Sequence, residues 1–345
     1  MDRHAVDHAV RHCEFDDLGG TGIVLAGYGP GSRDESHHNT VAHNHVHHIA
    51  RLWWQSSGIF ISQSGHNRIH DNLIHHTPYN GMTVTGPRPG ILDREVPRLT
   101  EGSHSARWEE LGDLPSDWWA HIGWKHARYN VIEHNEIHDA MEWLGDGNGL
   151  YLSGTGEGNI VRRNYVHDIP GTGTAAGIRN DDEQYFTLVE ENVIWKINAA
   201  GIITKNINMV ENNIVVDCYG ALEKGFCYIS LRHRGPCNGT GIRRNILLRP
   251  ADGHEPRRPF LEDSPLLADA AADDNLFWCA VCPEEAEAEL RDHRGRNKCL
   301  RGIAADPLFV DVGKGDFHLR EGSPAHRIGF RDIGRWGIRS SAGPV

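Results

Sequence analysis

The residues of this sequence that are best suited to chemistry are carboxylates at turns. Asp181 and Asp182 end the phrase Gly177-Ile-Arg-Asn-Asp-Asp, and Asp146 lies in the glycine-rich segment Gly145-Asp-Gly-Asn-Gly. Glycoside hydrolysis needs two acids beside one cleft, one as proton donor and the other as nucleophile or base. Taken singly, each Asp is equally suited to capping a turn through its own backbone.

Further polar residues accompany these acids and are candidates for binding a substrate. Glu142 lies in the segment that contains Asp146, and Lys205 falls in the same outward column of strand positions as Asp181. Arg232 follows Lys205 after 27 residues, about one repeat of the chain. The remaining candidates are outward residues of two strands, Tyr151 and Arg179.

Tryptophans are concentrated in one insertion, residues 87–128, which lacks the repeated phrase described below. It contains Trp108, Trp118, Trp119 and Trp124, four of the ten tryptophans of the chain. Aromatic rings can pack on the apolar faces of sugars, so Trp118, Trp119 and Trp124 are candidate substrate-binding residues on a flap over the outward column. The alternative is a loop that folds onto the body of the protein with its tryptophans as a private core.

A repeated phrase predicts the scaffold that positions these residues. An Asn followed by a short apolar strand, often ending in His or Asp, occurs seven times, at Asn44, Asn72, Asn135, Asn164, Asn192, Asn213 and Asn245. The spacings of 28, 63, 29, 28, 21 and 32 residues are typical of stacked coils. Amides at equivalent turns can form a ladder from coil to coil. We therefore predict an all-β fold, a single right-handed parallel β-helix.

A second strand in most coils opens on Gly58, Gly81, Gly149, Gly177 or Gly201. Its alternate residues should point into the core, and the intervening ones should point outward. The segment between Asn and Gly is 9 residues at Asn72 and Asn192 but 13 or 14 at Asn44, Asn135 and Asn164. The longer segments predict a wall of loops near residues 50–57, 140–148 and 170–176, where a site can form.

The expected organisation is a run of coils over residues 1–250, interrupted by the insertion, followed by coil remnants and a cap over 251–345. The first coil shows no cap of its own, so the chain is expected to lack an N-terminal region that its relatives carry. The net charge of −12 argues against nucleic acid or an anionic membrane as partner. No transmembrane run or signal peptide is recognisable.

Histidine and cysteine allow other chemistry. Many of the 24 histidines follow the repeated Asn, including His47-His48 and His75-His76, and we interpret them as stacked, half-exposed turn residues. Cys279, Cys282 and Cys299 lack the fourth ligand of a structural zinc site, and they are either buried thiols or contain a disulfide. We assign no metal site and no cofactor from the sequence.

The phrases around the acids resemble the core of glycoside hydrolase family 141. The similarity covers most of the chain and is most specific at Gly145-Asp-Gly-Asn-Gly-Leu-Tyr and Gly177-Ile-Arg-Asn-Asp-Asp. It implies that Asp146, Asp181 and Asp182 are catalytic and that the substrate is fucoside- or xylan-type. It also suggests a secreted or periplasmic protein. Arg179 and Asn180 depart from the usual Tyr-Leu of the family, which indicates an altered site.

A weaker similarity concerns polysaccharide lyase family 6, in which a Lys base and an Arg acid on neighbouring coils eliminate across a uronate. It implies these roles for Lys205 and Arg232, although Asn198-Ala-Ala-Gly replaces the expected calcium-binding phrase. Three hypotheses follow. The favoured one is hydrolysis of a poly- or oligosaccharide, with Asp181 or Asp182 as nucleophile or base and Asp146 as proton donor. The alternatives are a lyase or epimerase, and a non-catalytic carbohydrate-binding solenoid.

Overall fold

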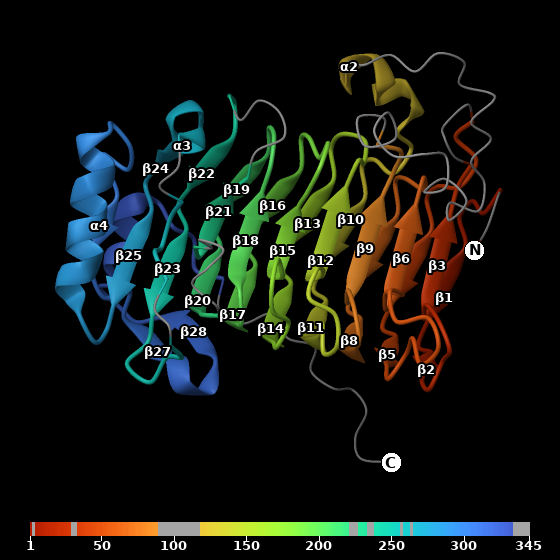
Figure 1. Cartoon of the computed structure of the whole chain (residues 1–345), viewed down its shortest axis with the longest axis horizontal. Coiled ribbons are helices and arrows are strands. Elements are labelled where there is room, and N and C mark those ends of the chain that lie inside the picture. The colour runs from red at the N-terminus through yellow and green to blue at the C-terminus, as the bar shows by residue number, and fades with distance from the viewer. Residues whose placement is uncertain are drawn as a thin grey trace.

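The computed structural model is a right-handed parallel β-helix, as the repeated phrase predicts. It describes residues 1, 4–28, 33–88, 118–220, 227–232, 238–255, 258–262 and 265–333. In this part of the chain, parallel sheets of nine, ten and seven strands run along the long axis of the molecule, from the first coils to helix α4 (Figure 1). Successive coils pair in the same order in every sheet.

The strands are short, as expected for coils that turn at every corner. The nine-stranded sheet consists of β1 (Ala9–Arg11), β4 (Thr40–Ala42), β7 (Arg68–His70), β10 (Val131–Glu133), β13 (Ile160–Arg162), β16 (Leu188–Glu190), β19 (Met209–Glu211), β22 (Gly241–Arg243) and β24 (Ala271–Asp273). The ten-stranded sheet consists of β2 (Glu14–Phe15), β5 (His45–His47), β8 (Leu73–Thr77), β11 (Glu136–Ala140), β14 (Tyr165–Ile169), β17 (Val193–Ile197), β20 (Ile214–Cys218), β23 (Ile246–Arg249), β25 (Leu276–Cys279) and β26 (Ile303–Ala304). The seven-stranded sheet consists of β3 (Ile23–Ala26), β6 (Ile59–Ser62), β9 (Met82–Thr85), β12 (Asn148–Ser153), β15 (Ala176–Asn180), β18 (Ala200–Thr204) and β21 (Ile229–Leu231).

Apart from one helix of 13 residues, the described helices are short, and all of them lie outside the three sheets. The elements outside the three sheets are α2 (Trp118–His121), η3 (Ile122–Trp124), α3 (Leu266–Asp269), α4 (Pro283–Gly295), β27 (Phe309–Asp311), η5 (Val312–Lys314), β28 (Asp316–Leu319) and η6 (Pro324–Ile328). None of the helices in the described residues has the length and apolar character needed to cross a bilayer. Cys279 and Cys299 are buried thiols, not halves of a disulfide.

The core lies inside the coils and follows the predicted alternation. The inward residues of the seven-stranded sheet are all fully buried, including Ile59, Leu150, Ile178 and Ile202. The glycine that opens these strands is required by a close approach between coils. A Cβ on Gly81 would lie 2.7 Å from the carbonyl oxygen of Gly149, and one on Gly149 would lie 2.8 Å from that of Gly177. A side chain at these positions would therefore force the coils apart.

The predicted asparagine ladder is confirmed. Asn164 donates its backbone N–H and its Nδ2 to the Oδ1 of Asn192, both at 3.0 Å, and its own Oδ1 accepts the same two bonds from Asn135. The ladder also extends one coil beyond the predicted members, because Asn245 makes the same pair of bonds to Asn275. Every amide in this stack is buried and satisfied from the neighbouring coils.

A second ladder was missed in the sequence. It consists of Asn39, Asn67, Asn130 and Asn159 at another corner of the first coils. Asn67 and Asn130 each make both bonds to the next Asn, whereas Asn39 bonds Asn67 Oδ1 through its backbone N–H. Each of them lies five residues before a member of the first ladder, so the signal is present in the sequence as Asn-x4-Asn.

The His or Asp that closes the repeated phrase has a backbone reason. His48, His76, Asp139 and Asp168 adopt positive φ values of 48°, 51°, 46° and 47°. This left-handed conformation is several-fold enriched in Asn, Asp and His. The residue type at the end of the phrase is therefore selected by the turn.

The C-terminal hairpin β27–β28 lies on the flank of the solenoid. Phe309 and Phe317 pack on outward residues of the ten-stranded sheet, including Trp195, Val216 and Leu248. In earlier coils the same outward column holds His75, His138 and His167. The column is apolar where the hairpin covers it. Without the hairpin, the Val and Leu on adjacent coils would face water, which is unfavourable for apolar side chains.

Removing one ladder amide should destabilise the fold measurably. Asn164→Ala leaves the buried backbone N–H of Asn135 without its acceptor and removes one of the two donors to Asn192 Oδ1, so we expect a loss of about 1–3 kcal/mol in the free energy of unfolding. Urea denaturation measures this loss. Asn238→Ala, at an exposed turn position, is the control and should leave the midpoint unchanged. Equal midpoints for both variants would contradict a stabilising ladder.

Candidate active site

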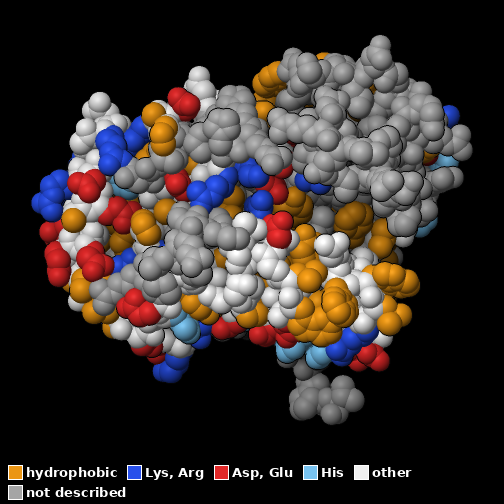
Figure 2. All heavy atoms as spheres, in the orientation of Figure 1, with side chains coloured by type: hydrophobic (Ala, Val, Ile, Leu, Met, Phe, Trp, Pro, Cys, Tyr) orange, Lys and Arg blue, Asp and Glu red, His pale blue; other side chains and the backbone are white. Residues whose placement is uncertain are grey.

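The predicted outward column exists on the seven-stranded sheet and carries charge. Backbone bonds continue past the strand ends, from Asp181 N to Leu152 O at 2.8 Å, from Lys205 N to Asn180 O at 3.0 Å and from Arg232 N to Thr204 O at 3.1 Å. Asp181, Lys205 and Arg232 therefore occupy equivalent positions on successive coils. In Figure 2, basic and acidic side chains gather near the middle of the face shown.

Asp181 is the centre of a buried ion-pair network. Its Oδ2 accepts a 2.8 Å hydrogen bond from the Tyr151 hydroxyl and lies 2.9 Å from Nη2 of Arg179. Its Oδ1 contacts the Lys205 ammonium. Only 8% of the Asp181 side chain is exposed. Three donors from three neighbouring coils thus converge on one carboxylate.

The protonation states within the network follow from this geometry. Burial alone would raise the pKa of Asp181, but the cations Arg179 and Lys205 outweigh burial and lower it below its usual value. Burial and the Asp181 carboxylate raise the pKa of Tyr151. Asp181 is consequently an anion at neutral pH, and the Tyr151 hydroxyl keeps the proton that it donates.

Asp146 is joined to the same network through Arg179. Its Oδ1 lies 3.2 Å from Nη1 of Arg179 and also accepts a hydrogen bond from the Thr174 hydroxyl. Because one planar guanidinium contacts both acids, the bonded oxygens of Asp146 and Asp181 are separated by no more than about 8 Å. The structure therefore brings these two predicted acids together, and the exposed fraction of the Asp146 side chain is 80%.

The other predicted polar residues have their own partners. Asp182 Oδ1 accepts a 2.6 Å bond from Lys205, so this ammonium bridges the two adjacent aspartates. Arg232 pairs with Glu262 at 3.0 Å. Glu142 lies in the expected loop. Burial raises the pKa of Glu142 above its usual value; His76 opposes this rise and the Asp139 carboxylate adds to it. Its charge thus interacts with the histidine-bearing turns.

The predicted wall of loops is present and is rich in exposed aromatic rings. Thr174 N bonds Gly145 O at 3.0 Å, which joins the second and third loops, and the rings of Trp54 and Trp143 meet edge to face at 5.7 Å across the first and second. Trp53, Trp54 and Trp143 are 69%, 54% and 53% exposed. Hydrophobic side chains form a patch in this region, at the lower right of Figure 2. Sequence analysis placed the loops but missed these tryptophans.

Only part of the tryptophan insertion can be compared with its prediction. Residues 89–117, which include Trp108, and the side chain of Trp118 lie outside the described residues. Trp119 is exposed and lies 5.3 Å from the ring of Phe186, just beyond the corner at Asp182. Trp124 accepts a 2.6 Å bond at its carbonyl from Gln63.

Two cations at the ends of the insertion were also missed in the sequence. Arg88 Nη1 reaches the Ser153 hydroxyl at 3.1 Å and the Tyr151 hydroxyl at 3.5 Å. Lys125 is fully buried and donates to the carbonyls of Pro87 and Gly154 at 2.6 and 3.0 Å. Burial lowers the pKa of Lys125 to about 8. Together they fasten both ends of the insertion to the coil beside the network, a role that the sequence pattern does not reveal.

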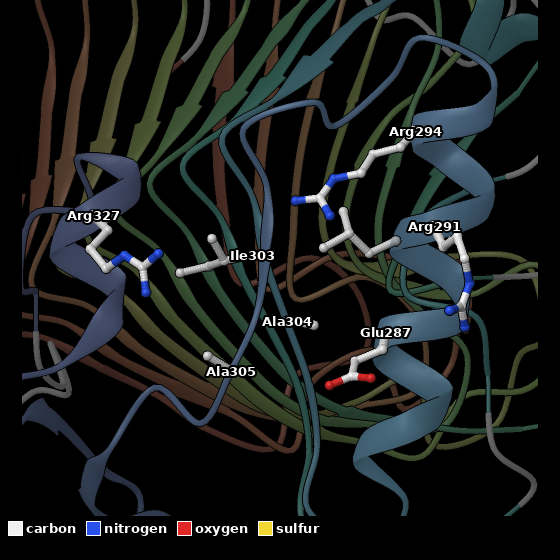
Figure 3. Close-up of a pocket in the computed structure, with 8 residues that line it drawn as sticks. Glu287, Arg291, Arg294, Ile303, Ala304, Ala305 and Arg327 are labelled. Atoms are coloured by element: carbon white, nitrogen blue, oxygen red, sulfur yellow. The ribbon is translucent and has the colours of Figure 1, made fainter.

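A separate pocket of about 410 Å³ lies at the C-terminal end of the solenoid (Figure 3). Arg294 and Glu287 of α4 point toward the segment that contains β26, and Arg327 of η6 lies on the other side of that segment. None of the predicted site residues lines this pocket, and Glu287 is its single carboxylate. The acid network on the seven-stranded sheet is therefore the better candidate for an active site.

No family model and no curated protein matches the sequence. Among solved structures, the chain is similar to the Agl-KA catalytic domain, with a TM-score of 0.51 and 9% identity over 81% of this chain and 44% of that one. It is also similar to the periplasmic alginate epimerase AlgG, at 0.43 and 14% over 74% and 49%, and to pectate lyase Pel9A, at 0.44 and 10% over 78% and 70%. The chain thus spans about half the length of the first two. Identities this low show the shared fold alone.

The Asp181 network should make stability depend on acid. The folded-state pKa of Asp181 is below the ordinary value of 3.8, so its ionised form stabilises the fold above about pH 4, and this contribution is lost as the pH falls through the lowered pKa. Between roughly pH 4 and pH 2, the free energy of unfolding should therefore decrease less steeply in Asp181→Asn than in the wild type. Urea denaturation across this range measures both slopes, and equal slopes would contradict the assignment.

Proposed function

We propose that this protein hydrolyses glycosidic bonds of a poly- or oligosaccharide on the outer face of its seven-stranded sheet. The observation that carries the proposal is the contact of Arg179 with both Asp146 and Asp181. Two carboxylates from neighbouring coils thus lie beside one guanidinium. Their separation of at most about 8 Å falls within the range that glycosidases use, about 5–9.5 Å. The resemblance to glycoside hydrolase family 141 implies the same acids and a fucoside- or xylan-type substrate.

The two acids differ in their burial and in their partners. Asp181 is held ionised by Arg179 and Lys205 and is suited to act as nucleophile or base, with Asp182 sharing the same ammonium. Asp146 is reachable from solvent and is assigned as proton donor. In the reaction, Asp146 protonates the leaving glycosidic oxygen as the bond to the anomeric carbon breaks. A water then gives its hydroxyl to that carbon and its proton to a carboxylate, which is Asp181 if this residue acts as base and Asp146 if Asp181 acts as nucleophile.

The exposed tryptophans of the wall supply a surface for the sugar chain. Trp143 precedes Asp146 by three residues in one loop and contacts Trp54 of the neighbouring loop. A polysaccharide lying along these rings would bury apolar surface on both sides and lead toward the acids. Tyr151, Arg179, Glu142, Arg88 and the partly described tryptophan insertion are the further candidates for contacts with substrate.

The lyase or epimerase alternative depends on Lys205 and Arg232. These residues occupy adjacent coils, as that mechanism needs, but Lys205 bridges Asp181 and Asp182, and Arg232 pairs with Glu262. Acting as base and acid would first require both ion pairs to break. This arrangement favours hydrolysis.

A panel of plant and bacterial polysaccharides tests the proposal. Release of reducing sugar without the ultraviolet absorbance of an unsaturated uronate is the expected result. Appearance of that absorbance would identify a lyase, and altered uronate composition without cleavage would identify an epimerase. Binding without any product would identify a carbohydrate-binding solenoid. Each of these three results would overturn hydrolysis.

The acid pair has a direct mutational test. Asp146→Asn and Asp181→Asn should each lower kcat by a factor of about 10²–10⁴, the usual contribution of general acid–base catalysis. Asp168→Asn is the control, because it also removes an ion-paired carboxylate, with an exposure of 43% that lies between those of Asp181 and Asp146, but on the ten-stranded sheet beside His167. It should retain activity. Asp146 is exposed, so its variant should keep its fold by circular dichroism, and full activity in that variant would end the assignment.

The tryptophan surface predicts an effect on binding alone. Trp54→Ala and Trp143→Ala should each weaken polysaccharide binding by about 1–2 kcal/mol, because each removes a large apolar contact, with little change in kcat. Affinity electrophoresis and steady-state kinetics measure the two quantities. Leu300→Ala removes a similarly exposed apolar side chain far along the chain and should change neither. Unaltered affinity in both Trp variants would remove this surface from the substrate path.

A further inference from the structure

A cluster of acceptor atoms lies at the N-terminal edge of the ten-stranded sheet. His47 closes strand β5, His48 follows it in the left-handed conformation, and Asp16 comes directly after the terminal strand β2. The cluster therefore joins two successive coils. His47 is largely buried, with 11% of its side chain exposed, whereas Asp16 and His48 are 52% and 40% exposed.

The three ligand atoms lie within 3.7 Å of one another. Asp16 Oδ1 lies 3.1 Å from His47 Nδ1 and 3.7 Å from His48 Nδ1, and the two Nδ1 atoms are 2.8 Å apart. Tetrahedral zinc with bonds of about 2.0–2.1 Å has ligand atoms roughly 3.3 Å from one another. Shifts of about half an ångström convert this triangle into three corners of such a site, and the exposure of Asp16 and His48 leaves the fourth corner to water.

The His47 ring is held on its other side by Glu14. Its Nε2 lies 3.1 Å from Glu14 Oε1. This contact directs Nδ1, at the opposite edge of the ring, toward Asp16 Oδ1 and His48 Nδ1. A carboxylate that receives the remote N–H of an imidazole is the usual outer partner of a metal-binding histidine.

Equivalent positions on later coils lack this combination. His75 and His76 repeat the pair of facing Nδ1 atoms at 2.6 Å. At His138 and His167 the following residue is Asp, whose carboxylate forms an ordinary hydrogen bond with Nδ1. Among the described residues, two other groups with suitable ligand spacing exist, His45/His47/His75 and His43/His70/Asp71. The first of these groups contains no carboxylate, and in the second His43 Nε2 lies 3.9 Å from Asp71 Oδ2, farther apart than any two ligand atoms of Asp16, His47 and His48.

We propose that Asp16, His47 and His48 bind a divalent transition-metal ion of the zinc class, with Glu14 orienting His47 and water as the fourth ligand. Two imidazoles and one carboxylate are the donor set that suits zinc. The ion links the coil of β2 to the coil of β5. Within the described residues, strand β2 pairs with a neighbour on one side only, so the metal fastens the terminal strand of the sheet and acts as a structural staple, separate from the acid network.

Zinc titration of the untagged protein, in competition with a chromophoric chelator, tests this site. The expected result is one tight equivalent, a melting temperature that rises with zinc concentration, and a tetrahedral visible spectrum when cobalt replaces zinc. Asp16→Asn and His48→Gln should each weaken zinc binding by more than about 100-fold and abolish the thermal shift, because each deletes a ligand. Glu14→Gln, which alters only the outer partner, should weaken it by about 10–100-fold.

Matched histidine variants separate this site from general affinity for a histidine-rich surface. His138→Gln removes a ring from the same stacked column without touching the cluster and should retain the tight equivalent. His75→Gln should retain it as well. Loss of binding in His75→Gln with retention in Asp16→Asn would place the metal in the neighbouring group and overturn the proposal. The absence of a tight equivalent in the wild type would also overturn it.

Discussion

The asparagine ladder is the constraint on which the rest of this structure depends. Each ladder amide bonds both the backbone and the side chain of the next coil, so it fixes the register of successive coils at one buried corner. Strand side chains alternate with a period of two, and a slip of one residue would exchange the core and the surface. The columns that carry Asp181 and Lys205, or His47 and His75, are aligned because the ladder holds this register.

The buried negative charge of Asp181 is compensated by its neighbours in the ion-pair network. A carboxylate as buried as Asp181 is costly unless cations and hydrogen bonds compensate for the lost water. Arg179, Lys205 and Tyr151 supply this compensation from three neighbouring coils. Arg179 departs from the family pattern that the sequence resembles, yet it is the residue that joins Asp146 to Asp181. The departure therefore links the two candidate acids.

Periodic features were predictable from the sequence, and single contacts between loops were not. The fold, the ladder and the shared column of Asp181 and Lys205 all follow from residues that recur at coil spacing. The meeting of Trp54 with Trp143, the position of Arg88 and the hairpin over Trp195 each occur once and depend on how a loop folds back. From the sequence, an apolar outward residue such as Trp195 can be expected to be covered, but the segment that covers it cannot be identified.

The outward column of the ten-stranded sheet shows how equivalent positions of one repeat can have different roles. Register places His47, His75, His138 and His167 in line with Trp195, so the turns are equivalent in backbone while their side chains differ. Where the column is apolar, a hairpin buries it. Where it is imidazole, the rings stack and present ring nitrogens at the surface. A solenoid holds every outward position at a fixed distance from the next, so a change of residue type alone can turn a buried flank into a surface for ligands.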